Sequence, residues 1–448
     1  MKQSIKNILY AFGAALILAA CADKLNVEPR NTIDDSSAVS TSSDVEALLV
    51  GAYSALSDTD VYGGAILRDA ELIGDDGEIF WDGTFVAPGE IFTKLMLVTN
   101  LQAQDTWRDS YKVINICNIV LANLDVVTPD KKERIEGEAK FLRGAVYFEL
   151  AREFGKTWTD GNPAQNPAVP LVVEPTTDSN ADDLVPRASV EAIYNQAISD
   201  LTEAETLLPE ENGFFATTYA ASAILSRIYL MQQDFAKAAA KANRVIESEE
   251  YELTDSFADA FNKGSSSGSN ATSEDIFAVQ ITSQDGTNDM NTFFASSDYG
   301  GRGDIYIEDK HFELYEPGDE RADLFYDDWT AKFNNVYGNI TIVRLAEMYL
   351  TRAEANFRTT QELGAEPVED INTIRDRVGL DPLETVTLSQ ILRERHIELA
   401  FEGHRIHDQK RTKSSVGSLP YSSPRLVFPV PQRELNIHDI GQNEGYGN

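Results

Sequence analysis

Apolar residues recur at positions i, i+3 and i+4 along most of this chain, the spacing that places them on one face of an α-helix. The segments that carry this pattern are residues 44–56, 107–127, 131–154, 190–208, 217–232 and 235–249. Because helical patterns dominate, the sequence predicts a mainly α fold with little β structure.

Several of the predicted helices are joined by brief turns. Only Gln233 and Asp234 separate the segments 217–232 and 235–249, and both segments carry small residues where two helices could approach closely. The positions that resemble a tetratricopeptide helix pair are Ala220, Ala221, Leu225, Tyr229 and Ala236. No strict repeat period is present, so we expect degenerate helix pairs that form a scaffold.

Acidic residues four apart mark the segment 393–411. Glu394, Glu398 and Glu402 would form one stripe on a helix, where like charges repel unless cations lie nearby. The candidate cations are Arg395 and Arg405, with Arg344, Arg352, Arg375 and Arg377 upstream. Apolar residues lie between the charges, so we expect a buried helix whose charges are paired to hold the fold rather than to do chemistry.

Other stretches lack a helical period. Residues 155–183 are rich in Pro, Asn and Asp, residues 264–273 in Ser, Gly and Asn, and residues 412–424 are irregular. Residues 73–100 also show no clear period, but Phe80, Trp81 and Phe85 argue against disorder. We therefore expect a long ordered loop there, and long ordered loops are often functional.

The N-terminus has the parts of a secretory signal: Lys2 and Lys6, a short apolar run, and small residues before Cys21. The run is too short to span a membrane. Cysteine directly after small residues is typical of bacterial lipoproteins, so we expect Cys21 to be acylated and to anchor the chain. The alternative is an ordinary secreted protein with a chance cysteine. Cys117 lies in an apolar helical segment and is predicted to be a core thiol.

Acidic residues outnumber basic ones, 73 to 38, and the formal net charge is −35 at pH 7. This balance argues against nucleic acid as a partner, because a polyanion would be repelled. An uncharged glycan would be indifferent to the charge, whereas a cationic peptide would be attracted.

A series of motifs marks the C-terminal part of the chain. They are IVRLAEMYLTRAEAN (342–356), INTIRDRVGL (371–380), RERHIELAFEGHRIHDQKR (393–411), VFPVPQRE (427–434) and QNEGY (442–446). In type and order they resemble the motifs of the SusD/RagB family, the outer-membrane nutrient-binding lipoproteins of Bacteroidetes. One departure is Gln409, where the family usually has leucine after the aspartate.

The resemblance implies a SusD-like fold, in which degenerate tetratricopeptide-type helix pairs form the scaffold and long loops hold the ligand. It also implies an organisation into a signal peptide (1–20), a lipidated tether (21–42), an N-terminal helical region (43–263) with a binding loop at 73–100, and a RagB/SusD C-terminal region (274–448).

In the family the ligand surface comes from two loops, which match residues 75–82 and 291–304 here. The candidate ligand-binding residues are Asp75, Asp76, Trp81, Phe85, Phe293, Phe294, Tyr299 and Arg302. Sugars stack on aromatic faces and hydrogen-bond to carboxylates and guanidinium groups. Trp81 is the first choice because acidic residues flank it and no helical pattern explains it, although each aromatic residue could equally belong to the loop core. Trp329 and Trp158 are further candidates, and Trp107 is expected in the core.

The implied function is a surface lipoprotein that captures a glycan and delivers it to a SusC-like TonB-dependent outer-membrane transporter, acting as its lid. Capture of peptides by a RagB-like lid is the main alternative, and a surface-anchored hydrolase is a third.

Catalytic and metal signals in the sequence are poor. Residues 264–268 satisfy G-x-S-x-G, but their low-complexity surroundings lack the strand and helix that flank a nucleophile. His404 and His407 are three apart, yet the five histidines show no further clustering along the chain. The sequence Asp75-Asp76-Gly77 lacks a calcium loop's final glutamate, since Val86 stands in that place. We therefore expect no enzyme activity, no cofactor and no metal.

Overall fold

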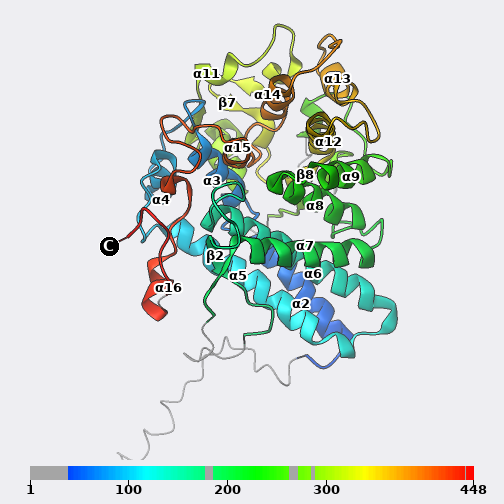
Figure 1. Ribbon diagram of the computed structural model, residues 1–448, viewed down its shortest axis with the longest axis vertical. Helices are drawn as coiled ribbons and strands as arrows, with labels where there is room; N and C mark the ends of the chain where they lie inside the picture. Colours follow the sequence, from blue (N-terminus) through cyan, green and yellow to red (C-terminus); the bar gives the residue numbers. More distant parts are fainter. Residues whose placement is uncertain (1–38, 177–184, 262–270, 284–287, 439, 448) are drawn as a thin grey trace, which may run out of the picture.

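Helices form most of the chain (Figure 1). The structure, a computed structural model, describes residues 39–176, 185–261, 271–283, 288–438 and 440–447. The α-helices within them are α2 (Ser42–Leu56), α3 (Ala65–Gly74), α4 (Val86–Thr93), α5 (Leu101–Ala122), α6 (Pro129–Phe154), α7 (Val190–Leu207), α8 (Thr218–Gln232), α9 (Phe235–Ile246), α10 (Asp289–Phe294), α11 (Asp309–Phe312), α12 (Leu345–Thr359), α13 (Pro367–Arg377), α14 (Leu388–Glu398), α15 (Arg405–Arg411) and α16 (Gln432–Ile437).

Strands are short and pair only in twos within the described residues. The antiparallel pairs are β1 (Ile79–Trp81) with β5 (Ile305–Ile307), β2 (Pro167–Pro170) with β3 (Arg187–Ser189), β4 (Asp275–Val279) with β8 (Ile340–Arg344), and β6 (Phe325–Tyr326) with β7 (Trp329–Thr330). The prediction of a mainly α fold with little β structure is confirmed.

Capping residues set the ends of the predicted helices. Thr41 begins α2 with a capping box, in which its side chain and that of Asp44 bond each other's backbone N–H groups. Helix α5 begins before Trp107, because the side chain of Asn100 accepts the N–H of Ala103 at 3.0 Å. Trp107 therefore lies inside the helix rather than at its start, and its 4% exposure confirms that it belongs to the core.

Neighbouring helices pack in pairs, α6 on α7 and α8 on α9, and α12 from the C-terminal part packs on α9 (Figure 1). At the turn between α8 and α9, Gln233 is left-handed (φ 61°) and Asp234 accepts the N–H of Lys237 to start α9. The predicted helix pair is thus present. One hydrophobic cluster runs from Val45 to Val430, so the core is shared by the predicted N-terminal and C-terminal regions.

The acidic stripe of segment 393–411 does not lie on one helix. Helix α14 ends at Glu398, and Glu402 follows in a turn where Gly403 has a left-handed backbone (φ 82°). Arg405 begins α15 and pairs with Asp76 and Glu78 rather than with the stripe. The expectation of a continuous helix was wrong. The chain turns at Gly403, and α15 then packs beside the residues that precede β1.

The charges of the stripe are nevertheless buried and paired, as predicted. Glu398 is 0% exposed and lies 2.7 Å from Arg344 and 3.3 Å from Arg321, with Arg377 as a third partner. Burial alone would raise the pKa of the Glu398 carboxyl, but these guanidinium groups outweigh it and hold that pKa well below its usual range. The segment therefore fixes the helices α12, α13 and α14 against one another.

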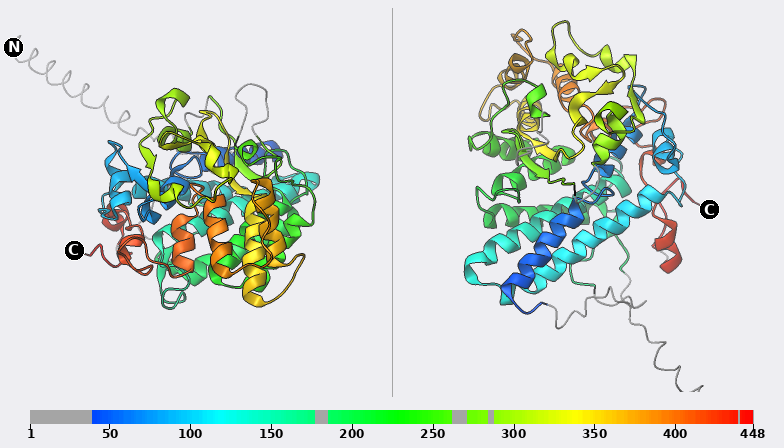
Figure 2. Two further views of the ribbon diagram at one scale, coloured as in Figure 1. Left: turned by 90° about the horizontal axis from the view of Figure 1, so that it is seen from above. Right: turned by 180° about the vertical axis from the view of Figure 1, so that it is seen from behind.

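The last two motifs fasten the C-terminal segment to the end of α6. The side-chain amide of Asn443 donates to the carbonyls of Phe154 at 2.9 Å and Phe428 at 2.7 Å. The N–H of Gln432 donates to the carbonyl of Val98 at 2.9 Å. As a result the C-terminal segment, red in Figure 2, runs along the side of the molecule that carries α4.

The region 73–100 is ordered but is more than a loop, since it contains β1 and α4. Cys117 is fully buried, as predicted. Cys21 with the rest of residues 1–38, and the G-x-S-x-G motif at 264–268, lie outside the described residues. Among the residues that are described, no helix combines the length and apolar character needed to cross a membrane.

Candidate functional site

The first segment predicted to bind ligand forms a two-stranded ribbon with residues that directly follow the second segment, 291–304. β1 pairs with β5 in antiparallel register, with Phe80 opposite Tyr306 and Trp81 opposite Ile305. Side chains of a strand alternate between its two faces, so Ile79 and Trp81 point into the molecule whereas Phe80 points outward. The two segments contact each other at the end of this ribbon, where the N–H of Asp82 donates to the carbonyl of Asp304 at 2.9 Å.

Trp81 is part of the core, not of the surface. Its side chain is 8% exposed and its ring lies 5.7 Å from that of Phe293. Gly83 and Gly89 approach the same ring so closely that a Cβ on Gly83 would lie 2.3 Å from it. A stacking platform needs a free face, so the choice of Trp81 as the leading sugar platform is corrected: the ring anchors the ribbon instead.

Phe293 and Phe294 require the same correction. Phe293 is 5% exposed, under Trp81 and the guanidinium of Arg68, which lies 4.5 Å from its ring centroid. Phe294 is fully buried beside Phe333 and Phe401, at 5.4 and 5.8 Å. Both lie on α10, a helix that turns its aromatic side inward, so they support the site from beneath.

A continuous row of rings occupies the outer side of the ribbon and the β6–β7 hairpin. Tyr299 lies 5.1 Å from Tyr326, Tyr326 lies 6.2 Å from Trp329, and Trp329 lies 5.2 Å from Tyr306, all between ring centroids. Phe80 projects from the same face of the ribbon because it lies directly opposite Tyr306, and its ring packs edge-on against Phe92 at 5.9 Å. We call Phe80, Tyr299, Tyr306, Tyr326 and Trp329 the aromatic strip.

The strip is partly open to solvent. Phe80 is 46% exposed and Tyr299 is 45% exposed, while the other three rings are half-buried. Trp329 is held in place by its indole N–H, which donates to the carbonyl of Gly303 at 3.3 Å. Gly303 has φ 65° and passes so close to the indole that a Cβ would lie 2.7 Å from Nε1. The backbone thus fixes the plane of the ring while leaving part of it accessible.

Phe85 and Arg302 form a second exposed contact near the strip. The guanidinium of Arg302 lies 4.7 Å from the centroid of Phe85, which is 49% exposed. Arg302 also donates to Asp304 at 2.9 Å and to Thr84 at 3.3 Å. These bonds hold the guanidinium plane, which remains at the surface. Of the predicted ligand residues, Phe85, Tyr299 and Arg302 are therefore exposed at the meeting point of the two segments.

Asp75 and Asp76 are committed to the fold. The Oδ1 atom of Asp75 accepts the N–H groups of Gly77, Glu78 and Ile79 at 2.9 to 3.0 Å, which closes the turn before β1. Asp76 pairs with Lys310 at 2.9 Å and Arg405 at 3.0 Å. Both carboxylates therefore shape the loop, and their contact with a ligand stays a prediction. Exposed aspartates that stand within two residues of strip members in the sequence are Asp82, Asp298, Asp327 and Asp328.

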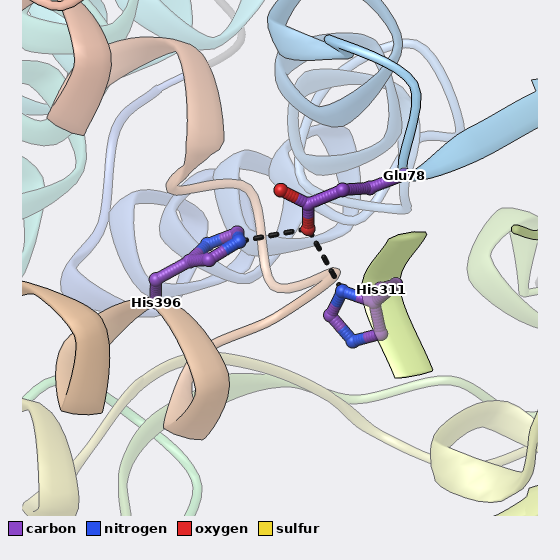
Figure 3. Close-up of side chains that lie close together, drawn as sticks. All are labelled: Glu78, His311 and His396. Carbon is purple, nitrogen blue, oxygen red and sulfur yellow. Dashed lines mark hydrogen bonds and ion pairs between the residues drawn. The ribbon is translucent and has the colours of Figure 1, made fainter. Parts of the chain in front are cut away.

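Behind the ribbon, Glu78 joins two histidines that are far away in the sequence (Figure 3). Its Oε2 atom lies 2.8 Å from Nδ1 of His311, on α11, and 2.8 Å from Nε2 of His396, on α14. Arg405 reaches its other oxygen, Oε1, at 2.9 Å. Glu78, which directly precedes β1, therefore bonds one residue each of α11, α14 and α15. The sequence showed no clustering of histidines beyond His404 and His407, and the structure corrects this.

The aromatic strip contains residues that sequence reasoning missed. Tyr306 and Tyr326 lie on strands of three and two residues, too short to show a period. The alternation in Ile79-Phe80-Trp81 was the available signal, since it places Phe80 opposite to Trp81. Trp158 packs against Tyr194 at 5.1 Å and lies away from the strip elements, whereas Trp329 belongs to it.

Comparisons with known proteins agree with this architecture. A family model described as starch-binding and associating with the outer membrane matches residues 28–230, and a second model, of the SusD family, matches residues 322–422. SusD-like protein P2 of Formosa agariphila is 24% identical over 94% of this chain and 93% of its own length. The starch-binding protein SusD of Bacteroides thetaiotaomicron is 32% identical over 24% of this chain and 22% of its own.

A crystal structure of a putative sugar binding protein from Bacteroides vulgatus has the same fold. It superimposes with a TM-score of 0.81 and 26% identity, covering 92% of this chain and all of the other.

Proposed function

Since this chain belongs to the SusD/RagB family, we propose that it is a cell-surface lipoprotein that captures a glycan on the aromatic strip. The observation that carries the proposal is the contiguous row of rings at the surface, from Tyr299 through Trp329 to Tyr306. Partly exposed rings leave apolar surface in contact with water, and a contiguous exposed apolar patch often marks a binding site. The apolar C–H faces of successive sugar units are suited to cover it.

Polar groups around the strip support the same ligand. Asp82, Asp298 and Asp327 are exposed carboxylates that can accept hydrogen bonds from sugar hydroxyls, and Arg302 can donate to sugar oxygens. Arg302 is already held by Asp304, so little side-chain freedom is lost when a ligand binds. In this proposal the strip binds the glycan and does not change it chemically.

The wider role that we propose rests on what the family resemblance implies. We infer that acylated Cys21 holds the protein on the outer membrane, and that it works as the lid of a SusC-like TonB-dependent transporter to which it delivers the glycan. Anchoring many copies on one surface raises the local concentration of binding sites for a long polymer. Co-purification of the transporter with this protein from outer membranes tests the lid, and its absence there would count against delivery.

A cationic peptide is the alternative ligand. The observation that favours it is the set of exposed aspartates next to strip residues in the sequence, together with the net charge of −35. Aromatic faces attract Lys and Arg side chains as well as sugars.

Affinity electrophoresis of the full-length protein in gels containing neutral polysaccharides tests the proposal. We expect one polysaccharide to retard the protein, and Phe80→Ala and Tyr299→Ala to weaken the binding about 10-fold or more, as for other aromatic contacts at the centre of an interface. Phe214→Ala is the matched control, because Phe214 is 52% exposed on the loop between α7 and α8. Retardation that survives both strip variants would contradict the site. Binding of a lysine-rich peptide without binding of any glycan would favour the alternative.

A further inference from the structure

Three metal-binding donor atoms converge behind the ribbon, in the cluster of Glu78, His311 and His396 (Figure 3). The atoms Glu78 Oε2, His311 Nδ1 and His396 Nε2 all lie within 4.8 Å of one another. We propose that this cluster binds one divalent transition-metal ion of the Zn²⁺ type. The inference is independent of the glycan and of the aromatic strip.

The donor set selects the class of ion. Two imidazole nitrogens and one carboxylate oxygen are typical of Zn²⁺ sites that keep a fourth position open, whereas Ca²⁺ and Mg²⁺ prefer oxygen donors alone. Tetrahedral ligands at about 2.0–2.1 Å from Zn²⁺ lie about 3.3 Å apart. Each histidine nitrogen is now 2.8 Å from the carboxylate oxygen, about half an ångström short of that separation, and the two histidine nitrogens lie within 4.8 Å of each other.

The surroundings of His311 suit a metal ligand. The ring is 0% exposed and is packed between Phe325 and Phe401, at 5.6 and 4.7 Å. Its second nitrogen, Nε2, lies 2.9 Å from the hydroxyl of Tyr315. A tyrosine hydroxyl can accept as well as donate, so Tyr315 can hold the proton of His311 on Nε2 and leave Nδ1 free for the ion.

Arg405 opposes metal binding through its contacts with His396 and Glu78. One of its nitrogens lies 3.3 Å from Nδ1 of His396 and another lies 2.9 Å from Oε1 of Glu78. Because arginine only donates, Nδ1 of His396 must accept, and the proton of that ring sits on Nε2, facing Glu78. Metal binding requires this proton to move to Nδ1 and the guanidinium to withdraw from His396. Arg405 is 18% exposed and also bonds Asp76, so it can withdraw toward solvent and keep that partner.

Access and charge are consistent with reversible binding. The side chain of His396 is 21% exposed, which gives an ion a route from solvent to the cluster. The positive charge of Arg405 beside the carboxylate lowers the affinity for a cation. The proposal therefore makes a directional prediction: Arg405→Gln should bind the ion more tightly than the natural protein.

Zn²⁺ titration by calorimetry tests the proposal, using the full-length protein without a polyhistidine tag. We expect one equivalent of Zn²⁺ to bind, at least about 10-fold weaker binding in His396→Ala, and tighter binding in Arg405→Gln. His438→Ala is the matched control, since His438 is a partly exposed histidine outside the cluster. Co²⁺ in place of Zn²⁺ should give the visible absorption of a tetrahedral site, which His396→Ala should remove.

Two results would overturn the inference. The first is the absence of a one-equivalent Zn²⁺ site in both the natural protein and Arg405→Gln, which removes the opposing charge. The second is a site whose affinity is unchanged in His396→Ala or is lost in His438→Ala. A destabilised His396→Ala does not obscure the answer, because Arg405→Gln changes the affinity in the opposite direction.

Discussion

Phe80 and Trp81 are adjacent residues that should respond to truncation in opposite ways. Trp81 is 8% exposed, so Trp81→Ala leaves a cavity beneath the ribbon, and changes of this size in a core cost about 3–5 kcal/mol. Phe80 is 46% exposed, so about half of its ring is already in water. Because full burial of a phenylalanine contributes about 1.5–3 kcal/mol, we expect Phe80→Ala to cost about 1 kcal/mol.

Urea denaturation of the two variants measures this difference. The midpoint for Trp81→Ala should fall clearly below that of the natural protein, while Phe80→Ala should stay close to it and the slope should be unchanged in both. Glycan affinity should show the reverse order, provided that Trp81→Ala is assayed well below its unfolding midpoint. Phe80→Ala should bind weakly because it loses a contact, and folded Trp81→Ala should keep the outer rings.

One combination of results would refute this reasoning. If Trp81→Ala unfolds within about 1 kcal/mol of the natural protein and yet loses all glycan binding, Trp81 is a surface platform after all. The burial of its ring against Phe293, and the assignment of the outer face to Phe80, would then both be wrong.

Three further experiments test buried side chains that can carry a charge. Glu398→Gln removes the charge shared by three arginines, and breaking such buried pairs costs about 3–5 kcal/mol, measurable by urea denaturation; a loss below about 1 kcal/mol would contradict the pairing. Burial lowers the pKa of His404 to about 3. Below about pH 6.5 this histidine is therefore protonated in the unfolded chain but still neutral in the folded protein. The free energy of unfolding should thus fall by up to about 1.4 kcal/mol per pH unit below 6.5 until about pH 3, and His404→Asn should reduce that slope. Burial raises the pKa of Cys117 to about 12, so a thiol reagent should label no cysteine in native protein extracted from membranes. After unfolding it should label one cysteine, Cys117. Labelling of two cysteines after unfolding would mean that Cys21 is not acylated.

The helical scaffold could be predicted because each helix repeats its pattern over several turns. Helices α6 and α8 are long enough for the apolar period to be sampled repeatedly, and their ends carry local signals such as the proline that begins α6. The break after Glu398 could not be predicted in the same way. Gly403 is a local signal for it, but the turn is held by Glu71, whose Oε1 accepts the N–H groups of Gly403, His404 and Arg405 from more than three hundred positions away.

The site was less predictable for a related reason. In a strand of three residues, the direction of each side chain depends on the partner strand, and a shift of one residue exchanges the two faces. Trp81 faces inward because β1 pairs with β5 in a register that places Phe80 beside Tyr306. Nothing near Trp81 in the sequence specifies that partner. Trp81 was favoured because acidic residues flank it and no helical pattern explains it, while the fold uses this ring as an anchor.

The segment 393–411 contacts both the helical scaffold and the ribbon. Through Glu398 it holds the helical scaffold together, and through His396 and Arg405 it grips Glu78, the residue immediately before β1. The ribbon that carries Phe80 is therefore braced from behind by the same segment that braces the core. A binding surface held in this way loses little entropy when a ligand arrives, which favours tight capture by few contacts. It follows that weakening the grip on Glu78 should reduce glycan affinity even though no ligand contact is removed.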